Sequence, residues 1–553
     1  MNDLINRING LSFTKANAII KQLCGIVNFF DSEESKNAFI TTYEVQCKVV
    51  REDRVSYGDW QTPPQLAKKV CISHILRCGI PDVIIEPTCG LGSFVLASLE
   101  SFPNLSEIHA VEINQEYTSI LKMNILLNAL SYPNREYPDI YIYTDDFFKF
   151  DFSNILNKCK LNNWNLAILG NPPWVTNSTQ GRNNSNNLPM KRNSFGLKGL
   201  DAITGKSNFD ISEYITLHLL ELSQFNKGGI SFLLKNSVIR NILTKQRVEN
   251  IHIENIEQRL IDASSEFNVS VDASCLSATF DGLPAVTCTV KDFYSDKCLY
   301  EYGWIGNSFV SDTKLYNSVS KYDGTSTYIW RSGIKHDCAS VLELTLEGET
   351  FVNGLGEVVE IEDDIVFPLI KSSDVRKYHN TPIRKYIIVP QRKIGTDTSV
   401  LKETHPKAYN YLTKHEWAFN QRKSSIYRDK DKFSIFGIGD YSFSKYKIVV
   451  SSLYKTISFI LVSQYAGKPI LVDDTCYQLD FNNYEEAKTI YDALNSKEIQ
   501  SLLCSLIFKD AKRVVTKSLL MRLDVAQLCV DKGIIINTER FISNIIRQPS
   551  LFD

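Results

Sequence analysis

From Asp82 to about residue 235, short apolar stretches alternate with amphipathic ones, and this alternation constrains the fold more than any other feature. We expect strands over residues 82–90, 107–113, 139–148, 165–174 and 228–234, and helices over residues 91–101, 115–130 and 211–225. A helix between successive strands returns the chain to the same end of the sheet, so the strands run mostly parallel. The sequence therefore predicts an α/β domain with a doubly wound, mostly parallel sheet.

Two further parts flank this domain. A chain of 553 residues is longer than a single hydrophobic core supports. Apolar residues near helical spacing predict helix within residues 1–50. Another helix follows, with Thr62 as its N-cap and Pro63 in its first helical position. After about residue 295 the alternation gives way to irregular, aromatic-rich segments and a helical tail. We predict an N-terminal helical segment (1–50), the α/β domain (51–295) and a C-terminal mixed α+β domain (296–553).

The charge of the chain neither indicates nor excludes a nucleic-acid partner. The net charge is −2, but binding requires a local basic face and not a basic total. Basic residues outnumber acidic ones in three segments, 181–206, 421–432 and 509–522. Such a charge run is more often an ordinary solvated face than a phosphate contact, so charge alone decides nothing.

Thirteen cysteines occur without a CxxC pair or the spacing of a zinc site. We therefore expect reduced thiols, no metal and a cytoplasmic protein. No secretory leader and no apolar run of membrane-spanning length is expected, so no membrane partner is predicted.

The loop after the first strand, Glu86-Pro-Thr-Cys-Gly-Leu-Gly-Ser-Phe94, lies where open α/β sheets bind ligands. Gly90 and Gly92 allow the backbone to approach a ligand closely. The loop lacks the GxGxxG pattern and a lysine, so a dinucleotide or P-loop phosphate fits poorly. The carboxylate of Glu86 instead suits a ligand that carries a positive charge.

Acidic residues also end the next two strands. Glu112 follows the second strand, where its two oxygens suit a ribose diol. Asp146 and Phe147 follow the third strand, where they suit the amino group and the face of an adenine. Three acids at the ends of three successive strands favour a ligand site over a purely structural loop.

The fourth strand ends in Gly170-Asn-Pro-Pro-Trp174. Two consecutive prolines cannot continue a strand, because neither has an N–H and each restricts the residue before it. A stiff tetrapeptide, Asn171 to Trp174, is therefore expected at the carboxyl end of a buried strand.

Taken in order, “EPTCGLGSF”, “AVEI”, “TDDFF” and “GNPPW” resemble the motifs of S-adenosylmethionine-dependent amino-methyltransferases. More narrowly, they resemble the gamma group of N6-adenine DNA methyltransferases, in which the cofactor loop precedes the catalytic tetrapeptide and a target recognition domain follows. The upstream “WQTPPQLA” and the downstream “SSEFNVSVDASCLSATF” are similar to two further motifs of that group. The resemblance covers roughly residues 57–280.

The resemblance implies a class I methyltransferase fold, S-adenosylmethionine as cofactor and double-stranded DNA as partner. The implied cofactor-binding residues are Thr62, Glu86, Thr88, Gly90, Gly92, Glu112, Asp146, Phe147 and Asn171. The implied catalytic residues are Asn171, Pro172, Pro173, Trp174 and Phe267.

The tetrapeptide suits the methylation of an exocyclic amine. Such an amine is a poor nucleophile because its lone pair is delocalised into the ring. If the Asn171 side-chain oxygen and the Pro172 carbonyl each accept one N–H, the lone pair is freed, and the prolines hold both acceptors rigidly. A base within a duplex must be flipped out to reach this site. We expect Trp174 and Phe267 to stack on its two faces.

The C-terminal part contains basic residues interleaved with Tyr and Phe, a pattern that suits phosphate contacts and base reading. The candidate DNA-binding residues are Lys191, Arg192, Arg392, Lys393, Arg422, Lys423 and Arg428.

Other functions remain open from the sequence. Methyltransferases that act on an RNA base amine or on a protein glutamine also carry similar tetrapeptides, although the glutamine enzymes lack a large C-terminal domain. A nuclease or a catalytically inactive DNA-binding subunit is less favoured, because no convincing PD…(D/E)xK arrangement is present and every cofactor-contacting position holds a competent residue. We predict a site-specific adenine-N6 DNA methyltransferase, either of a restriction–modification system, with any cognate endonuclease encoded separately, or an orphan enzyme without one.

Overall fold

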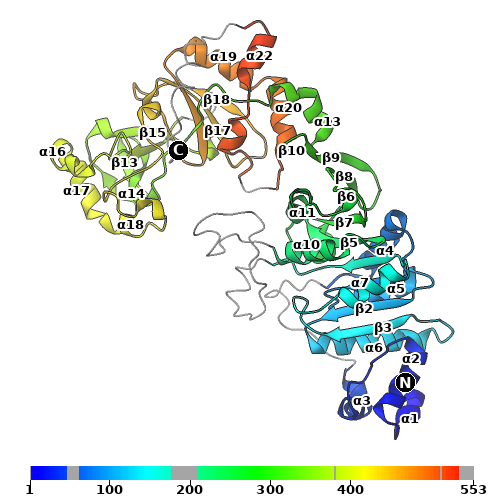
Figure 1. The fold of residues 1–553 in the computed structure, drawn as a ribbon. Helices are drawn as coiled ribbons and strands as arrows, with labels where there is room; N and C mark the ends of the chain where they lie inside the picture. The colour runs from blue at the N-terminus through cyan, green and yellow to red at the C-terminus, as the bar shows by residue number, and fades with distance from the viewer. Residues whose placement is uncertain (1, 47–60, 176–209, 379–381, 511–512, 535–553) are drawn as a thin grey trace. The chain divides into compact units, whose positions relative to one another are not determined.

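A computed structural model describes residues 2–46, 61–175, 210–378, 382–510 and 513–534. The chain forms two compact units, Met1–Phe309 and Val310–Asp553. Figure 1 shows the elements of both.

A single sheet organises the first unit. In the described residues its strand order is β10-β9-β8-β6-β7-β5-β4-β1-β2-β3. The strands are β1 (Val83–Glu86), β2 (Glu107–Glu112), β3 (Asp139–Thr144), β4 (Leu166–Gly170), β5 (Gly228–Lys235), β6 (Ile253–Ile261), β7 (Ala273–Phe280), β8 (Thr287–Asp292), β9 (Cys298–Ile305) and β10 (Ser308–Val310). Strands β1 to β5 pair in parallel, whereas β7 is antiparallel to both β5 and β6.

The helices of the first unit cover both faces of this sheet, since every residue of β1 and β4 is buried. The helices are α1 (Asn2–Ile8), α2 (Phe13–Cys24), α3 (Glu33–Gln46), α4 (Pro64–Cys78), α5 (Ser93–Ser101), α6 (Gln115–Ser131), α7 (Ser153–Leu161), α10 (Ile211–Ser223), α11 (Asn236–Val248) and α12 (Ala263–Phe267). Helices α2, α4, α5 and α6 share one hydrophobic core, whereas α7 packs against α10 and α10 against α11.

The predicted strand–helix alternation and the mostly parallel sheet are confirmed. The strand order reverses between β1 and β4, which are neighbours with β2 on the far side of β1. The predicted ligand edge, at the carboxyl ends of these strands, therefore lies at a topological switch point. This is the class I methyltransferase fold.

The predicted start of α4 was wrong by one residue. Pro63 is extended (φ −57°, ψ 136°) and serves as the N-cap, and Pro64 occupies the first helical position. Pro64 forces the residue before it out of the helical region, so Thr62 cannot be the N-cap.

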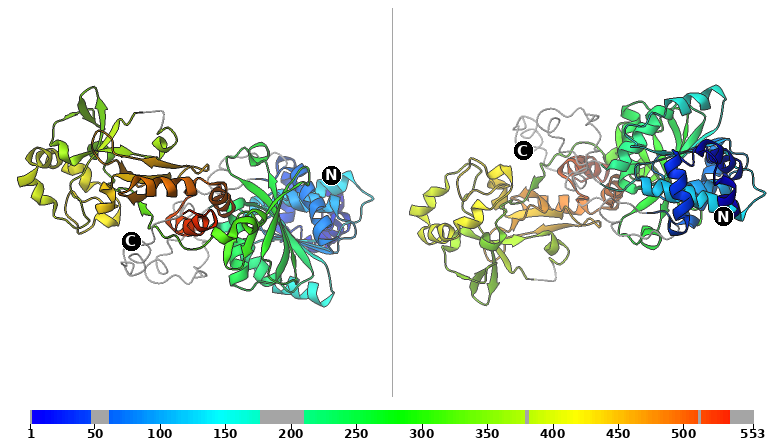
Figure 2. Two further views of the ribbon diagram at one scale, coloured as in Figure 1. Left: turned by 90° about the horizontal axis from the view of Figure 1, so that it is seen from above. Right: turned by 90° about the horizontal axis from the view of Figure 1, so that it is seen from below.

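The N-terminal helices belong to the first unit and cover the edge of its sheet at β3. Ile26 forms a parallel bridge to Ile140, and the backbone of Gly25 and Val27 completes the pairing. The views in Figures 1 and 2 agree in placing α2 beside β3 and α6. A sheet edge that would otherwise be open is thereby paired.

The division between the units lies later than the expected boundary near residue 295. That boundary falls in the turn between β8 and β9, and these strands pair antiparallel, with Thr287 opposite Gly303. The hairpin keeps residues up to Phe309 with the first sheet.

The second unit is a mixture of strands and helices, as predicted. Its sheets have the orders β11-β20-β17-β18 and β14-β13-β12-β16-β15-β19. The strands are β11 (Arg331–Ser332), β12 (Glu343–Glu347), β13 (Thr350–Asn353), β14 (Val358–Val359), β15 (Val366–Ile370), β16 (Lys385–Ile388), β17 (Tyr446–Ser451), β18 (Phe459–Val462), β19 (Leu471–Val472) and β20 (Cys476–Phe481). The helices are α13 (Thr313–Val319), α14 (Ala339–Leu342), α15 (Ser372–Val375), α16 (Leu401–Thr404), α17 (Pro406–Lys414), α18 (Glu416–Asn420), α19 (Tyr484–Leu494), α20 (Lys497–Leu506), α21 (Lys517–Leu520) and α22 (Val525–Asp531).

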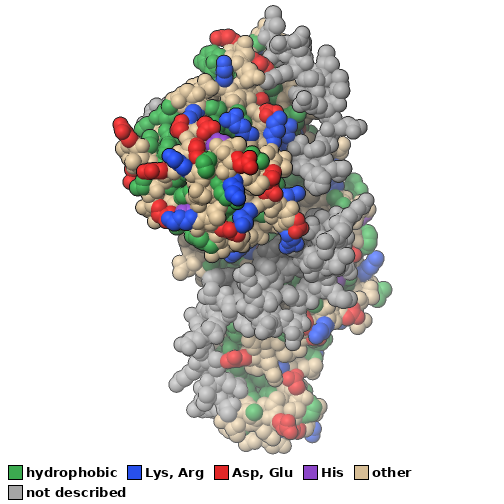
Figure 3. All heavy atoms as spheres, turned by 90° about the vertical axis from the view of Figure 1, so that its left-hand side faces the viewer, with side chains coloured by type: hydrophobic (Ala, Val, Ile, Leu, Met, Phe, Trp, Pro, Cys, Tyr) green, Lys and Arg blue, Asp and Glu red, His purple; other side chains and the backbone are tan. Residues whose placement is uncertain are grey.

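The surface of the second unit carries charges of both signs. On the lobe that contains α16 to α18, basic and acidic side chains intermingle and no single-sign field dominates (Figure 3). No helix in the described residues is long and apolar enough to cross a bilayer.

Candidate active site

The loop between β1 and α5 is built around two glycines. Gly90 (φ +53°) and Gly92 (φ +84°) adopt left-handed conformations that side chains rarely tolerate. A Cβ on Gly92 would lie 2.0 Å from the Leu121 side chain, so a larger residue there would displace Leu121 and also strain the backbone. The carboxylate of Glu112, at the end of β2, accepts the N–H groups of Gly90 and Asn114, each at 2.9 Å. The end of β2 therefore holds the loop in place.

Glu86 ends β1 directly before this loop and is a buried carboxyl, with 2% of its surface exposed. Burial raises its pKa well above the usual range, and backbone N–H groups of Val95 and Phe94 in α5 only partly oppose this. Among the described residues, its Oε2 atom has no hydrogen-bond partner. A buried carboxylate oxygen without a partner is costly, and a cationic group would satisfy it.

The segment before α4 crosses this loop. The Gln61 side-chain oxygen accepts the N–H of Leu91 at 3.1 Å, and the Thr62 carbonyl accepts the Ser93 hydroxyl at 2.7 Å. Gln61 was not predicted from the sequence, although its place directly before “TPP” was a usable signal. The hydroxyl of Thr88 is also buried and has no partner among the described residues.

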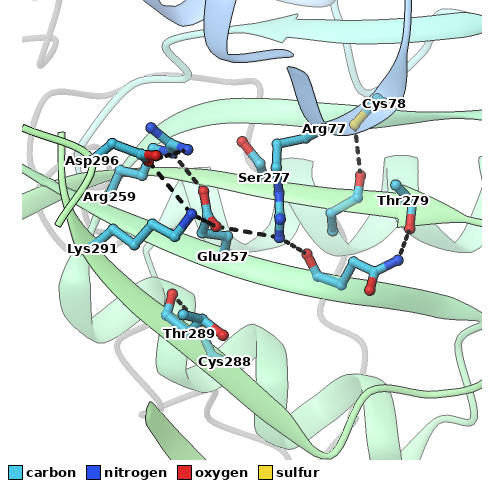
Figure 4. Close-up of polar contacts among 12 residues, drawn as sticks. Arg77, Cys78, Glu257, Arg259, Ser277, Thr279, Cys288, Thr289, Lys291 and Asp296 are labelled. Atoms are coloured by element: carbon cyan, nitrogen blue, oxygen red, sulfur yellow. Dashed lines mark hydrogen bonds and ion pairs between the residues drawn. The ribbon is translucent and has the colours of Figure 1, made fainter. Parts of the chain in front are cut away.

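A network of charges fixes the other end of α4 to the sheet (Figure 4). Glu257 of β6 is 1% exposed and lies between Arg77 (3.3 Å), Arg259 (2.5 Å) and Lys291 (3.0 Å). Asp296 pairs with Arg259 at 2.8 Å and Lys291 at 3.4 Å. Because one carboxylate is shared by cations from α4, β6 and β8, the helix that carries the crossing segment cannot easily shift.

Asp146 and Phe147 lie beyond the end of β3, and both are buried. The Asp146 side chain accepts the N–H of Phe148 at 3.1 Å. The Phe147 ring packs edge-on against His218 of α10, with 6.0 Å between ring centroids. The structure thus places both residues at the same carboxyl edge as Glu86 and Glu112.

The tetrapeptide Asn171 to Trp174 follows β4 directly. A Cβ on Gly170 would lie 3.7 Å from Pro87 and 3.9 Å from the Glu86 side chain. The residue before Asn171 therefore packs against the cofactor loop. Asn171 and Pro173 are partly exposed, whereas Pro172 and Trp174 are buried.

Three contacts anchor the downstream half of the tetrapeptide. The Trp174 indole N–H donates to the Leu233 carbonyl at 3.1 Å. The Lys235 ammonium donates to the Trp174 carbonyl at 3.0 Å. The Val175 carbonyl accepts the N–H of Ile211 at 2.9 Å. Lys235 was missed by sequence reasoning, although a single lysine that ends the apolar strand “GGISFLLK” at the ligand edge was a signal.

Trp174 and Phe267, the two rings expected to stack on a flipped base, lie next to each other in the structure. The two rings pack edge to face, with 5.3 Å between centroids and 67° between planes, and each is 7% exposed. A base between two rings requires them to be roughly parallel and about twice the stacking distance apart.

In the second unit, two candidate DNA-binding residues, Arg392 and Lys393, lie on one exposed loop. The loop that carries Arg392 and Lys393 packs on residues 431–440, since the Gln391 amide donates to the Ile435 carbonyl at 3.2 Å and Lys393 pairs with Asp440 at 3.1 Å. Arg392 is exposed and stacks on Phe443, 4.9 Å from the ring centroid.

The remaining candidate DNA-binding residues differ in their exposure and in their contacts. Lys423 and Arg428 are exposed. Arg422, by contrast, donates to the carbonyls of Phe419, Lys432 and Ser434 at 3.1, 2.9 and 2.6 Å. Its guanidinium thus holds a loop together. Lys191 and Arg192 lie outside the described residues.

The described residues contain one group that could in principle hold a metal, His336, Glu343 and Asp473, whose ligand atoms lie within 4.8 Å of one another. The Lys371 ammonium lies 2.6 Å from Glu343 and 3.7 Å from Asp473 and already supplies a cation. Although burial opposes it, hydrogen bonds from His336 and Lys371 lower the pKa of Glu343 to about 2. This group is an ion-pair network within the second unit.

Two comparisons identify relatives of the chain. Residues 34–264 match the family model described as N-6 DNA Methylase. The Type II methyltransferase M.NspV of Nostoc sp. (strain ATCC 29411 / PCC 7524) is 40% identical over 483 residues, which cover 87% of this chain and 98% of that protein.

Among solved structures, the Type IIL restriction-modification enzyme MmeI in complex with DNA aligns with a TM-score of 0.46 and 11% identity, over 87% of this chain and 74% of that one. A modification subunit of a putative type I restriction enzyme from Vibrio vulnificus YJ016 aligns with a TM-score of 0.29 and 16% identity, over 49% and 55% of the two chains.

The match to M.NspV extends through both units, and the match to the family model covers the site around Glu86 and Asn171. The chain therefore belongs to the N-6 DNA methylase family, as an S-adenosylmethionine-dependent, adenine-specific DNA methyltransferase of the restriction–modification type.

Proposed function

We propose that the carboxyl edge of β1 to β4 is the cofactor site and that the tetrapeptide beside it is the catalytic site. The observation that carries this is the packing of Gly170 against Glu86 and Pro87, since it brings the two sites to one place. When bound, S-adenosylmethionine supplies an electrophilic methyl group on a sulfonium.

The residues at this edge fit that cofactor. Glu86 offers a buried carboxylate oxygen without a partner to the ammonium of the methionine part. Glu112 ends β2 at this edge, where the two oxygens of its carboxylate suit the ribose hydroxyls. Asp146 and Phe147 would hold the adenine by its amino group and its face. Thr62 and Thr88 complete the wall of the site.

The tetrapeptide acts on the target amine by accepting hydrogen bonds from its two N–H groups. The Asn171 side-chain oxygen and the Pro172 carbonyl each accept one N–H of adenine N6, and the nitrogen lone pair turns toward the methyl group for direct displacement. Proline fixes the backbone and Trp174 is anchored to β5, so the acceptors need no reorganisation during the reaction. No covalent enzyme intermediate is required.

Access to these acceptors requires the target adenine to leave the duplex. Because Trp174 and Phe267 touch in this structure, the flipped base has to separate them before it can stack. Phe267 ends the short helix α12, whereas Trp174 is anchored through its indole N–H. We therefore propose that Phe267 is the ring that moves.

The second unit reads the DNA sequence in this proposal. Arg392, Lys393, Lys423 and Arg428 are exposed, and the first two lie on the loop that packs on residues 431–440. Their charges suit phosphate contacts that position the duplex for base reading. The intermingled acidic side chains limit non-specific attraction (Figure 3). We further propose a separately encoded cognate endonuclease and, since the substrate is DNA, a cytoplasmic enzyme.

Substitution Asn171→Ala tests the catalytic assignment. Removal of one of two acceptors should lower single-turnover methylation by about 10²–10³-fold, as when one preorganised donor or acceptor is deleted. Dissociation constants for cofactor and for specific duplex should change little, because neither the loop nor the second unit is altered. Substantial activity of Asn171→Ala would place catalysis elsewhere.

The same experiment distinguishes the substrate classes when 2-aminopurine replaces the target adenine in the duplex. Flipping unstacks this base, so its fluorescence should rise on binding to both the parent and Asn171→Ala. Phe267→Ala should raise the signal further, because one quenching ring is lost. A methyltransferase that acts on protein glutamine or on RNA would leave the fluorescence unchanged and the DNA unlabelled.

A further inference from the structure

Lys235 stands at a junction between the catalytic tetrapeptide and three elements of the first unit. It is the last residue of β5 and the N-cap of α11. Its ammonium donates to the Trp174 carbonyl at 3.0 Å and to the Asp210 carboxylate at 2.6 Å. Only 20% of its side chain is exposed, and 9% of that of Asp210.

Asp210 is itself held in place on the other side. It is the N-cap of α10, and its Oδ1 atom accepts the N–H of Ser212 at 3.1 Å and the hydroxyl of Ser212 at 2.6 Å. The next residue, Ile211, donates its N–H to the Val175 carbonyl. Hydrogen bonds thus connect residues 174–175 with residues 210–211, and the Lys235 ammonium contacts both segments.

The ion pair between Lys235 and Asp210 differs from an ordinary surface salt bridge in its burial and in the number of acceptors that share the ammonium. Lys235 carries a positive charge that is largely removed from water and is shared between a carboxylate and a peptide carbonyl. Loss of the ammonium would leave the Asp210 carboxylate and the Trp174 carbonyl without this donor. The carbonyl belongs to the tetrapeptide, so its orientation bears directly on the acceptors two and three residues upstream.

We propose that Lys235 is a positioning residue for methyl transfer, which orients the Asn171 to Trp174 tetrapeptide through the Trp174 carbonyl. This inference rests on the proposed catalytic role of the tetrapeptide. The Trp174 indole bond to Leu233 fixes the ring, and the Lys235 bond fixes the peptide unit behind it. Together they hold the Pro172 carbonyl and the Asn171 side chain at one angle to the target amine.

The test is the single-turnover rate of Lys235→Met, a substitution that keeps most of the side-chain volume but removes the charge and the donors. A displacement of about 1 Å in a catalytic group costs on the order of 10²-fold in rate. We expect the rate to fall roughly 10- to 100-fold, with the dissociation constant for S-adenosylmethionine within about twofold of the parent. Lys235→Arg, which keeps a cationic donor, should recover most of the rate.

Lys245→Met is the matched control. Lys245 pairs with Glu213 at 2.7 Å and is 12% exposed, so it is another buried lysine that ties α11 to α10. This ion pair joins α11 to α10 and does not involve the tetrapeptide. Lys245→Met should lower the melting temperature about as much as Lys235→Met but leave the rate unchanged.

The inference is overturned if Lys235→Met slows methyl transfer no more than Lys245→Met, or if cofactor binding is lost together with the rate. Should Lys235→Met fail to fold, Asp210→Asn is the second variant. It keeps the N-cap oxygen of α10 but weakens the hold on the ammonium, and an unchanged rate then contradicts the proposal. Asn171→Ala in the same assay separates failure of this inference from failure of the proposed catalytic site. If methyl transfer is slow in Asn171→Ala but as fast as the parent in Lys235→Met, only the role of Lys235 is refuted. If methyl transfer by Asn171→Ala is as fast as that of the parent, the catalytic site itself is refuted.

Discussion

Glu86 combines two properties that seldom occur together in one residue, full burial and a carboxylate oxygen without a partner among the described residues. Burial raises its pKa in the cofactor-free protein. The stability that this group contributes is therefore fully present below its usual pKa near 4.5 and is lost as the pH rises through the raised value. In the proposed cofactor site, the same oxygen is the one that would receive a cationic group.

Substitution Glu86→Gln is expected to act in opposite directions on stability and on binding. The amide stays neutral, so the cofactor-free variant should melt at a higher temperature than the parent at pH 9 and close to it at pH 5. Affinity for S-adenosylmethionine should fall by roughly 10- to 100-fold, since a charged hydrogen bond contributes about 1.5–3 kcal/mol. Thermal melts from pH 5 to 9 and titration calorimetry measure the two effects.

Equal cofactor affinity of Glu86→Gln and the parent would exclude Glu86 from the site. A lower melting temperature of the variant at pH 9 would show that a further group satisfies the carboxylate in the cofactor-free protein. Glu100→Gln is a suitable control, because Glu100 lies in the same region on α5 but is exposed and pairs with Lys68 on the surface.

Among the elements, the edge strand β3 depends on the N-terminal helices. Gly25 ends α2 with φ +80° and accepts the N–H of Ile140 through its carbonyl. A Cβ at this position would lie 2.1 Å from the Pro138 carbonyl oxygen. The close approach of the two backbones, and not only the left-handed conformation, therefore requires glycine here.

Comparison of Gly25→Ala with Gly10→Ala separates these two requirements. Gly10 has nearly the same φ, +78°, but a Cβ there would meet no atom of the described residues within 4 Å. Gly10→Ala should cost about 1–2 kcal/mol of unfolding free energy, the usual penalty of a left-handed residue. Gly25→Ala should cost more, because α2 must also move away from β3.

Hydrogen exchange at Ile140 provides the specific measurement for this prediction. Its amide should lose protection in Gly25→Ala and keep it in Gly10→Ala, and the exposed edge should make Gly25→Ala more prone to aggregate. Equal protection in the two variants would mean that the N-terminal helices do not hold the edge of the sheet.

For the whole molecule, the two units have separate hydrophobic cores. One core gathers side chains from the N-terminal helices and the large sheet, and others lie entirely within the second unit. A fragment that ends at Phe309 should therefore fold, bind S-adenosylmethionine and lose sequence-selective DNA binding. Titration against specific and random duplexes at fixed salt measures the discrimination.

A fragment that ends at residue 295 is the informative control, because it removes β9 from its antiparallel partner β8. It should melt at a lower temperature than the longer fragment. Undiminished discrimination between duplexes by the 1–309 fragment would place sequence recognition in the first unit and refute the proposed role of the second.

Local sequence determined the central part of the first unit. Apolar runs bounded by glycine, proline and acidic residues predicted β1 to β5 because burial on both faces selects such runs wherever helices cover a parallel sheet. The two prolines of the tetrapeptide predicted the end of β4 because their effect on the backbone acts over one or two residues. The acids at the ends of β1, β2 and β3 were predicted to meet because parallel strands end at the same edge.

Only the tertiary structure decided features that depend on contacts between distant residues. The guanidinium of Arg422 holds carbonyls up to twelve residues away, so its charge could not reveal that it is structural. Trp174 and Phe267 close on each other because the two rings meet across the sheet edge. Lys235 reaches the tetrapeptide across 61 residues of sequence, and the β8–β9 hairpin extends the first unit beyond residue 295. Packing and long-range hydrogen bonds fix these arrangements, and a local pattern such as the lysine at the end of “GGISFLLK” can mark a residue but cannot name its distant partner.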